Sequence, residues 1–315
     1  MIDSLLDRAT SILERRFLRN AFLPVLLFAP LVSVPVLLQN DMLARALAVW
    51  EEQPITAKFA AVIGYFTFCW FGAAVVASQW RNIIRLFEGY PLQRLPWLEA
   101  KGVSWHAARS AALVDMGDRR HHTTEVHGLR YWAYPETEFL PTRLGNVIRA
   151  AEFYPIQRYG ISLINVWPRL YKILPRAVAD DVEDSRATME FLLVLCLWLV
   201  GFAVVSPLLA WSFGTSPPWA LMVFATALLF AYWAYLSALP AAAEYGEHLR
   251  AAFEVHRFDL LRQLRLPLPP DERREHDQWR LLDDLILKAE RPVWAYEPEP
   301  ADELTVRIVI DEAGP

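Results

Sequence analysis

Long stretches without a charged side chain alternate with charged stretches along this chain. Residues 21–40, 59–80 and 191–243 contain no Asp, Glu, Lys, Arg or His, and the third stretch is long enough for two helices joined by a turn at 214–218. A helix needs roughly 20 apolar residues to cross the hydrocarbon core of a bilayer. The pattern predicts a mainly α-helical integral membrane protein with four transmembrane helices arranged as two hairpins, with helical cytoplasmic regions and a little β-structure.

The same pattern divides the chain into five parts. We expect an amphipathic interfacial helix at 1–20, a first transmembrane hairpin at 21–80, a cytoplasmic segment at 81–189, a second transmembrane hairpin at 190–240 and a helical cytoplasmic tail at 241–315. The β-structure is expected as a hairpin at 118–134 and a strand at 304–310.

The positions of Lys and Arg predict the orientation of the spans. Cationic side chains flank the four spans on the side of the two termini: Arg8, Arg15, Arg16, Arg19, Arg81, Arg85, Arg94, Lys172, Arg176, Arg186, Arg250 and Arg257. The loop between the first two spans has only Arg45 and Lys58, and the loop between the last two has none. Because cytoplasmic loops are enriched in Lys and Arg, we expect both termini in the cytoplasm.

Composition agrees with a membrane protein that carries a substantial polar part. Apolar residues make up 55% of the chain and charged residues 21%, and the 13 Trp are typical of membrane–water interfaces. The net charge of −5 gives no basic face for nucleic acid. We therefore expect the lipid bilayer, further copies of this chain and a cytoplasmic protein as partners, and no nucleic acid.

Three prolines interrupt the first predicted span. Pro24, Pro30 and Pro35 each remove a backbone N–H donor, so the helix should be kinked or broken. The irregular backbone would then line a cavity, as in transporters, or simply bend a helix that holds no site.

Small residues recur on one side of the second predicted span. Cys69, Ala73 and Ala77 are spaced by four residues, with Gly72 beside them. Such a face lets helix backbones approach closely, so we expect it to pack on another helix, either within the chain or in a second subunit.

The densest polar set next to apolar neighbours lies in a helix expected to begin after Pro141 and to end at Pro155. Arg143, Asn146 and Arg149, together with Arg158, could bind an anionic headgroup or phosphate, because guanidinium groups suit such ligands. Alternatively they form a structural ion-pair network in which Glu152 holds Arg149.

One cluster has the residue types of a metal site. His121, His122, Glu125 and His127 lie close together in the sequence, but their spacing matches no specific zinc motif. The cluster is therefore either a metal site or a solvated polar hairpin. We found no catalytic motif and no cofactor-binding motif, so no catalytic residue is assigned and any cofactor is unknown.

Part of the chain resembles uncharacterised bacterial multi-span inner-membrane proteins. The resemblance covers residues 141–152, Tyr154-Pro155, Arg158-Tyr159-Gly160, 167–170 and the region around 258–261. This resemblance implies the bacterial inner membrane and carries no activity. The order of spans also resembles that of bestrophin-like anion channels, by topology alone.

These observations favour a membrane protein that acts by assembly, as an oligomeric channel or as a scaffold for cytoplasmic partners. The alternative is a membrane-bound enzyme that acts on lipid headgroups or other amphiphiles through the arginine-rich segment.

Overall fold

The structure of this chain is a computed structural model that describes residues 17–31, 37, 41–119, 131, 133–212, 214 and 216–288. Every regular element within these ranges is a helix. The predicted strand at 304–310 and most of the predicted hairpin at 118–134 lie outside them, as do residues 1–16 of the predicted interfacial helix. The helix α7 continues to Arg119, so the hairpin does not begin at residue 118 as expected.

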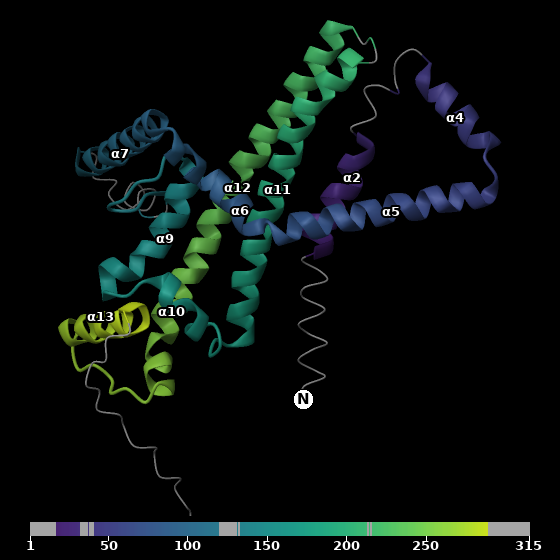
Figure 1. Cartoon of the computed structure of the whole chain (residues 1–315). Coiled ribbons are helices and arrows are strands. Elements are labelled where there is room, and N and C mark those ends of the chain that lie inside the picture. The colour runs from purple at the N-terminus through teal and green to yellow at the C-terminus, as the bar shows by residue number, and fades with distance from the viewer. Residues whose placement is uncertain are drawn as a thin grey trace, which may run out of the picture.

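The two longest helices, α11 (Arg176–Ser212) and α12 (Pro217–Gln263), organise the molecule. They run side by side with a short connection at 213–216, where the sequence predicts a turn (Figure 1). The remaining helices are η1 (Leu18–Phe22), α2 (Leu23–Leu31), α4 (Met42–Glu52), α5 (Ile55–Ser78), α6 (Trp80–Glu88), η2 (Tyr90–Arg94), α7 (Pro96–Arg119), α9 (Arg143–Tyr159), α10 (Leu163–Leu170) and α13 (Glu272–Lys288).

One end of the α11–α12 pair is built into a compact body. The helices α9, α10 and α13 gather around this end, while the other end of the pair stands alone (Figure 1). Trp279 of α13 and Phe253 of α12 are fully buried there, with ring centroids 5.5 Å apart. Burial of such large aromatic side chains is a main contribution to the stability of a core.

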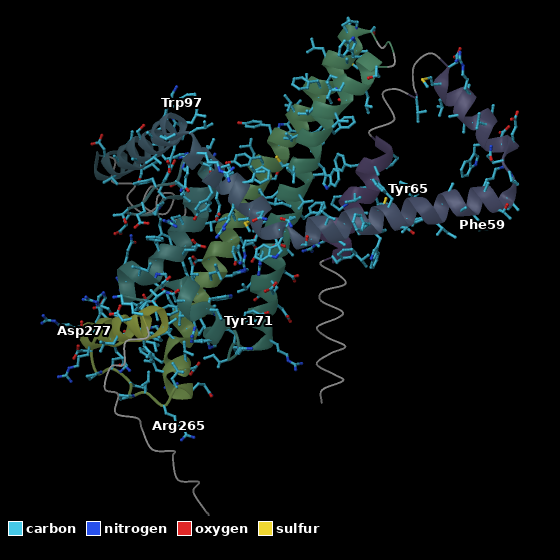
Figure 2. The ribbon with its side chains drawn as sticks, viewed as in Figure 1. Phe59, Tyr65, Trp97, Tyr171, Arg265 and Asp277 are labelled. Atoms are coloured by element: carbon cyan, nitrogen blue, oxygen red, sulfur yellow. The ribbon has the colours of Figure 1, made fainter. Side chains whose placement is uncertain are left out.

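Three helices are long and apolar enough to cross a membrane: Ile55–Ser78, Arg176–Leu209 and Pro217–Gln263. The first predicted span corresponds to a shorter apolar helix, Leu18–Pro30. The helix α5 does not run alongside α11 and α12 but lies across their direction and extends away from them, with α4 turning back at its tip (Figure 1). Most of α5 is exposed, and Phe59 lies on its outer part (Figure 2).

The small-residue face of α5 packs within the chain. Cys69 and Ala73 are fully buried against Ala21 and Val25 of the first apolar helix, and a Cβ at Gly72 would lie 3.3 Å from Val25 Cγ1. Ala77 is partly buried at the edge of the same cluster. The sequence left two packing partners open, a helix of the same chain and a helix of a second subunit. Among the described residues, the helix that packs on this face belongs to the same chain.

The prolines of the first apolar helix change its backbone in two ways. The π-helix η1 directly precedes Pro24, and Pro30 lies inside α2, while Pro35 is outside the described residues. Pro30 has no N–H to donate to the carbonyl oxygen of Leu26. The Tyr65 hydroxyl on α5 donates to that oxygen at 2.6 Å, where α2 crosses α5 (Figure 2). Tyr65 therefore replaces the hydrogen bond that Pro30 cannot make.

The proline at 155 behaves differently from the prediction. The helix α9 continues through Pro155 to Tyr159 and ends at Gly160, whose backbone φ of 82° terminates it. Pro155 is buried, so packing of the helix outweighs the single lost hydrogen bond.

We expect Tyr65→Phe to lower the free energy of unfolding by about 1 kcal/mol, because the Leu26 carbonyl loses the hydroxyl that donates to it. Thermal unfolding of the detergent-purified protein measures the change. Tyr232→Phe is the matched control, since Tyr232 is an exposed tyrosine on α12. Equal shifts for the two variants would contradict this role of Tyr65.

Candidate functional site

A cavity of about 470 Å³ lies beside the α11–α12 pair. Six helices of the described part of the chain line it. Its residues are Trp80, Arg81, Ile84, Arg85 and Glu88 of α6, Tyr90 of η2, Ile148, Arg149 and Glu152 of α9, Leu163, Ile164 and Trp167 of α10, Arg186 and Met189 of α11, and Tyr245 and Leu249 of α12. The cavity thus combines an apolar wall with four guanidinium groups and two carboxyl groups.

Close helix packing brings these walls together. A Cβ added at Gly145 of α9 would lie only 2.5 Å from the carbonyl oxygen of Glu88, so α6 rests directly on α9. A Cβ at Gly246 of α12 would lie 2.9 Å from the Cβ of Ala151, so α9 also rests directly on α12. Glycine at both positions permits the close approach that places the charged residues of α6 and α9 around one space beside α12.

The cavity lies at the end of the uncharged part of α11 and α12. Met189 precedes the uncharged stretch 191–243 by two residues, and Tyr245 follows it by two. The arginines of α6 follow directly after α5, the third apolar helix. The cavity is therefore at the level where each of the three long apolar helices becomes charged.

The four arginines differ in how they are held. Arg186 pairs with Glu190 at 3.1 Å and Glu183 at 3.8 Å, and its guanidinium lies 4.2 Å from the centre of the Trp80 ring. Arg81 and Arg85 make no ion pair with another described residue and lie over the rings of Trp80 and Tyr90. These two exposed arginines can reach a ligand without breaking an ion pair.

Arg149 is half-buried and combines an ion pair with one buried donor atom left unpaired by the described residues. Its Nη2 pairs with Glu138 at 2.7 Å and its guanidinium lies 4.3 Å from the centre of the Phe153 ring. Its Nε is buried and has no hydrogen-bond partner among the described residues. Arg149 is paired with Glu138 and not with Glu152, so the predicted ion pair within α9 is wrong.

The other residues predicted for an anion site do not line the cavity. The side chain of Asn146 is fully buried and accepts from the Leu140 N–H at 2.9 Å while it donates to the carbonyl oxygens of Leu140 and Thr142, so it fixes the loop before α9. Arg143 is exposed. Arg158 lies 4.0 Å from Glu272 beside a second, smaller hollow. Of the predicted set, only Arg149 belongs to the cavity.

The predicted metal ligands His121, His122, Glu125 and His127 lie outside the described residues, so that prediction stays open. Within the described ranges, no group of three or more His, Cys, Asp or Glu is placed to hold a metal ion.

Sequence reasoning missed Arg81, Arg85, Arg186 and the two carboxyl groups as members of one site. The signal was present, because Arg81, Arg85 and Arg186 stand within a few residues of the ends of uncharged stretches. We used these residues only to predict the orientation of the spans.

No protein-family model, curated protein sequence or solved structure matches this chain. The chemistry of the cavity is therefore the basis on which its function has to be judged. A wall that is apolar on one side and cationic on the other suits an amphiphile with an anionic group.

The two carboxyl groups of the cavity hold their protons unusually tightly. Burial, together with the nearby charge of Glu88 and against the opposing charge of Arg149, raises the pKa of Glu152 from 4.5 to about 7. Burial also raises the pKa of Glu88, against the opposing charges of Arg85 and Arg149. Glu152 therefore changes its charge near neutral pH.

This shift makes the stability of the protein depend on pH. Because folded Glu152 binds its proton more tightly than unfolded Glu152, stability should fall as the pH rises from about 4.5 to about 7. We expect Glu152→Gln to be more stable than wild type by up to about 3 kcal/mol near pH 8, and equally stable near pH 4.5.

Thermal unfolding across this pH range measures the difference. Glu136→Gln, at an exposed position, is the control that should leave the pH profile unchanged. A constant offset between Glu152→Gln and wild type at every pH would contradict the raised pKa.

Proposed function

We propose that this protein is a multi-pass membrane protein that binds an amphiphile carrying an anionic phosphate group, in the cavity at the cytoplasmic surface of the bilayer. The observation that carries the proposal is the position of four arginines beside an apolar wall, at the level where α5, α11 and α12 change from apolar to charged. A phospholipid at this depth has its phosphate near the arginines and its acyl chains near the apolar wall.

The arrangement in the membrane is part of the proposal. We propose four crossings in two hairpins, with α11 and α12 as one hairpin and the short apolar helix Leu18–Pro30 and α5 as the other, which requires α5 to align with α11 and α12 in a bilayer instead of lying across their direction. The uncharged part of α11 alone, residues 191–212, is about 33 Å long at about 1.5 Å per residue, which matches the hydrocarbon core. The Lys and Arg distribution supports cytoplasmic termini, and the resemblance of 141–152 to bacterial membrane proteins supports the bacterial inner membrane.

The chemistry of the lining supports binding of a phosphate-bearing group. Guanidinium groups form charge-assisted hydrogen bonds with phosphate oxygens, each contributing roughly 1.5–3 kcal/mol. Arg149 has a buried Nε without a partner, and Arg81 and Arg85 are not engaged in ion pairs with described residues. A bound phosphate would satisfy the Nε donor and add to the stability of the cavity.

The exposed surface of α5 supports a second candidate function, assembly into an oligomeric channel or scaffold. Phe59, Ile63, Phe68 and Phe71 are each more than 60% exposed, and α4 has no buried residue. Lipid or a second copy of the chain would cover this helix in a membrane. An enzymatic alternative, acting on headgroups, would use the cavity itself, with Glu152 as the group that accepts or donates a proton.

Binding of short-chain phosphatidylglycerol to the detergent-purified protein tests the proposed function. We expect Arg149→Ala and Arg81→Ala each to weaken binding about tenfold, because each removes one charge-assisted contact. Arg143→Ala removes an exposed arginine from the same helix as Arg149 and outside the cavity, so affinity should stay unchanged. Titration calorimetry measures the dissociation constants.

Two outcomes would overturn the proposal. Equal loss of affinity in all three variants would mean that the lipid responds to surface charge in general. Inorganic phosphate is a second probe; if it binds as tightly as phosphatidylglycerol, the apolar wall contributes nothing and the ligand is a free anion instead of an amphiphile.

A further inference from the structure

The two carboxyl groups of the cavity are not explained by binding of an anion alone. Glu88 on α6 and Glu152 on α9 both line the space that the four arginines line. Neither makes an ion pair or a side-chain hydrogen bond with another residue that the structure describes. Two largely buried carboxylates would repel a bound phosphate, so a site for a purely anionic ligand would be better built without them.

The arginines do not neutralise these carboxyl groups directly. Arg149 and Arg186 are directed to Glu138, Glu183 and Glu190, all of which lie outside the cavity lining. Arg81 and Arg85 stack over aromatic rings. The cavity therefore holds positive and negative groups side by side, with the negative pair left available to a ligand.

We infer that the cavity recognises a zwitterionic aminophospholipid such as phosphatidylethanolamine, with the arginines binding its phosphate and Glu88 and Glu152 binding its ammonium group. This inference rests on the proposed function and names the headgroup. A primary ammonium has three N–H donors, so it can bond to two carboxylates at once. The rings of Trp167 and Tyr245, which also line the cavity, favour a cation near their faces.

The inferred ligand also changes the protonation of the site. The charged and titratable groups around Glu152 are Arg149 on its own helix, Arg85 and Glu88 on α6, Tyr90 on η2, Arg186, Glu183 and Glu190 on α11, and Tyr245 on α12. An ammonium beside the Glu152 carboxylate stabilises its charged form and lowers its pKa from about 7, so binding releases a proton. A purely anionic headgroup has the opposite effect, because its charge raises the pKa.

The two classes of headgroup should therefore bind with opposite pH dependence. Between about pH 8 and about pH 6, on either side of a pKa near 7, we expect short-chain phosphatidylethanolamine to bind about tenfold more weakly as the pH falls. Short-chain phosphatidylglycerol should bind more tightly over the same change. Titration calorimetry of the full chain in detergent, repeated in buffers of different ionisation enthalpy, gives both the affinities and the protons released.

Substitutions of single carboxyl groups test which residue causes the pH dependence of lipid binding. Glu152→Gln should remove the pH dependence for both lipids and reduce the preference for phosphatidylethanolamine by about tenfold, equivalent to about 1.4 kcal/mol. Glu88→Gln should reduce the same preference. Glu244→Gln, an exposed position one residue from Tyr245, is the control and should change neither. The comparison of the two lipids on wild-type protein needs no variant, so it stands even if a substitution impairs folding.

The outcomes separate this inference from the proposed function. If phosphatidylglycerol binds in an arginine-dependent way and both lipids show the same pH dependence, the ammonium site is refuted while the proposed function stands. If neither lipid binds, the proposed function fails and this inference fails with it.

Discussion

The structure depends on one constraint, which is that α11 and α12 are each a single continuous helix from the charged body to the uncharged end. Met189 and Leu193 of α11 are buried in one cluster with Ala238 and Ala242 of α12, so the boundary between charged and uncharged side chains lies at the same height on both helices. Residues 189 and 245, two residues outside that boundary on either side, both line the cavity. The proposed position of the site at the membrane surface follows from this shared boundary.

Packing of small residues then determines what faces the cavity. Gly145 allows α9 to rest on the backbone of Glu88, and Gly246 allows α12 to rest on Ala151. These approaches bring Arg149 and Glu152 of α9 to the same space as the arginines of α6. Burial of Glu152 beside Glu88 raises its pKa to about 7 despite the opposing charge of Arg149, and such shifts are typical of binding sites.

The sequence predicts the helical content and the long apolar helices well, because lack of charge over 20 residues is a local property. The turn near Gly214 and the continuation of α12 beyond the uncharged stretch were predicted for the same reason. The role of Pro155 was predicted wrongly, since its burial and the glycine at 160 decide where α9 ends. Tyr65 could not be linked to Pro30 from the sequence, because their interaction depends on how α2 crosses α5.

The candidate site was predicted only in part, for a physical reason. Arg149 was chosen with Arg143 and Asn146 because they are close in sequence, but one helix presents these residues to three different environments. The members that matter come from α6 and α11, about 60 and 40 residues away along the chain. The position of an arginine near the end of an apolar stretch indicated the residues of the cavity better than the local density of arginines did.

The central claim is that the cavity lies at the headgroup level while the free end of α11 lies in hydrocarbon. Spin labels at the exposed positions Asp180, Thr188 and Val204 of α11 test it most directly, in protein reconstituted in liposomes with Cys69 and Cys196 replaced by alanine. We predict that collision with oxygen increases and collision with a water-soluble nickel complex decreases from Asp180 to Val204, with Thr188 near the headgroups. Free access of the nickel complex to Val204 would contradict the account.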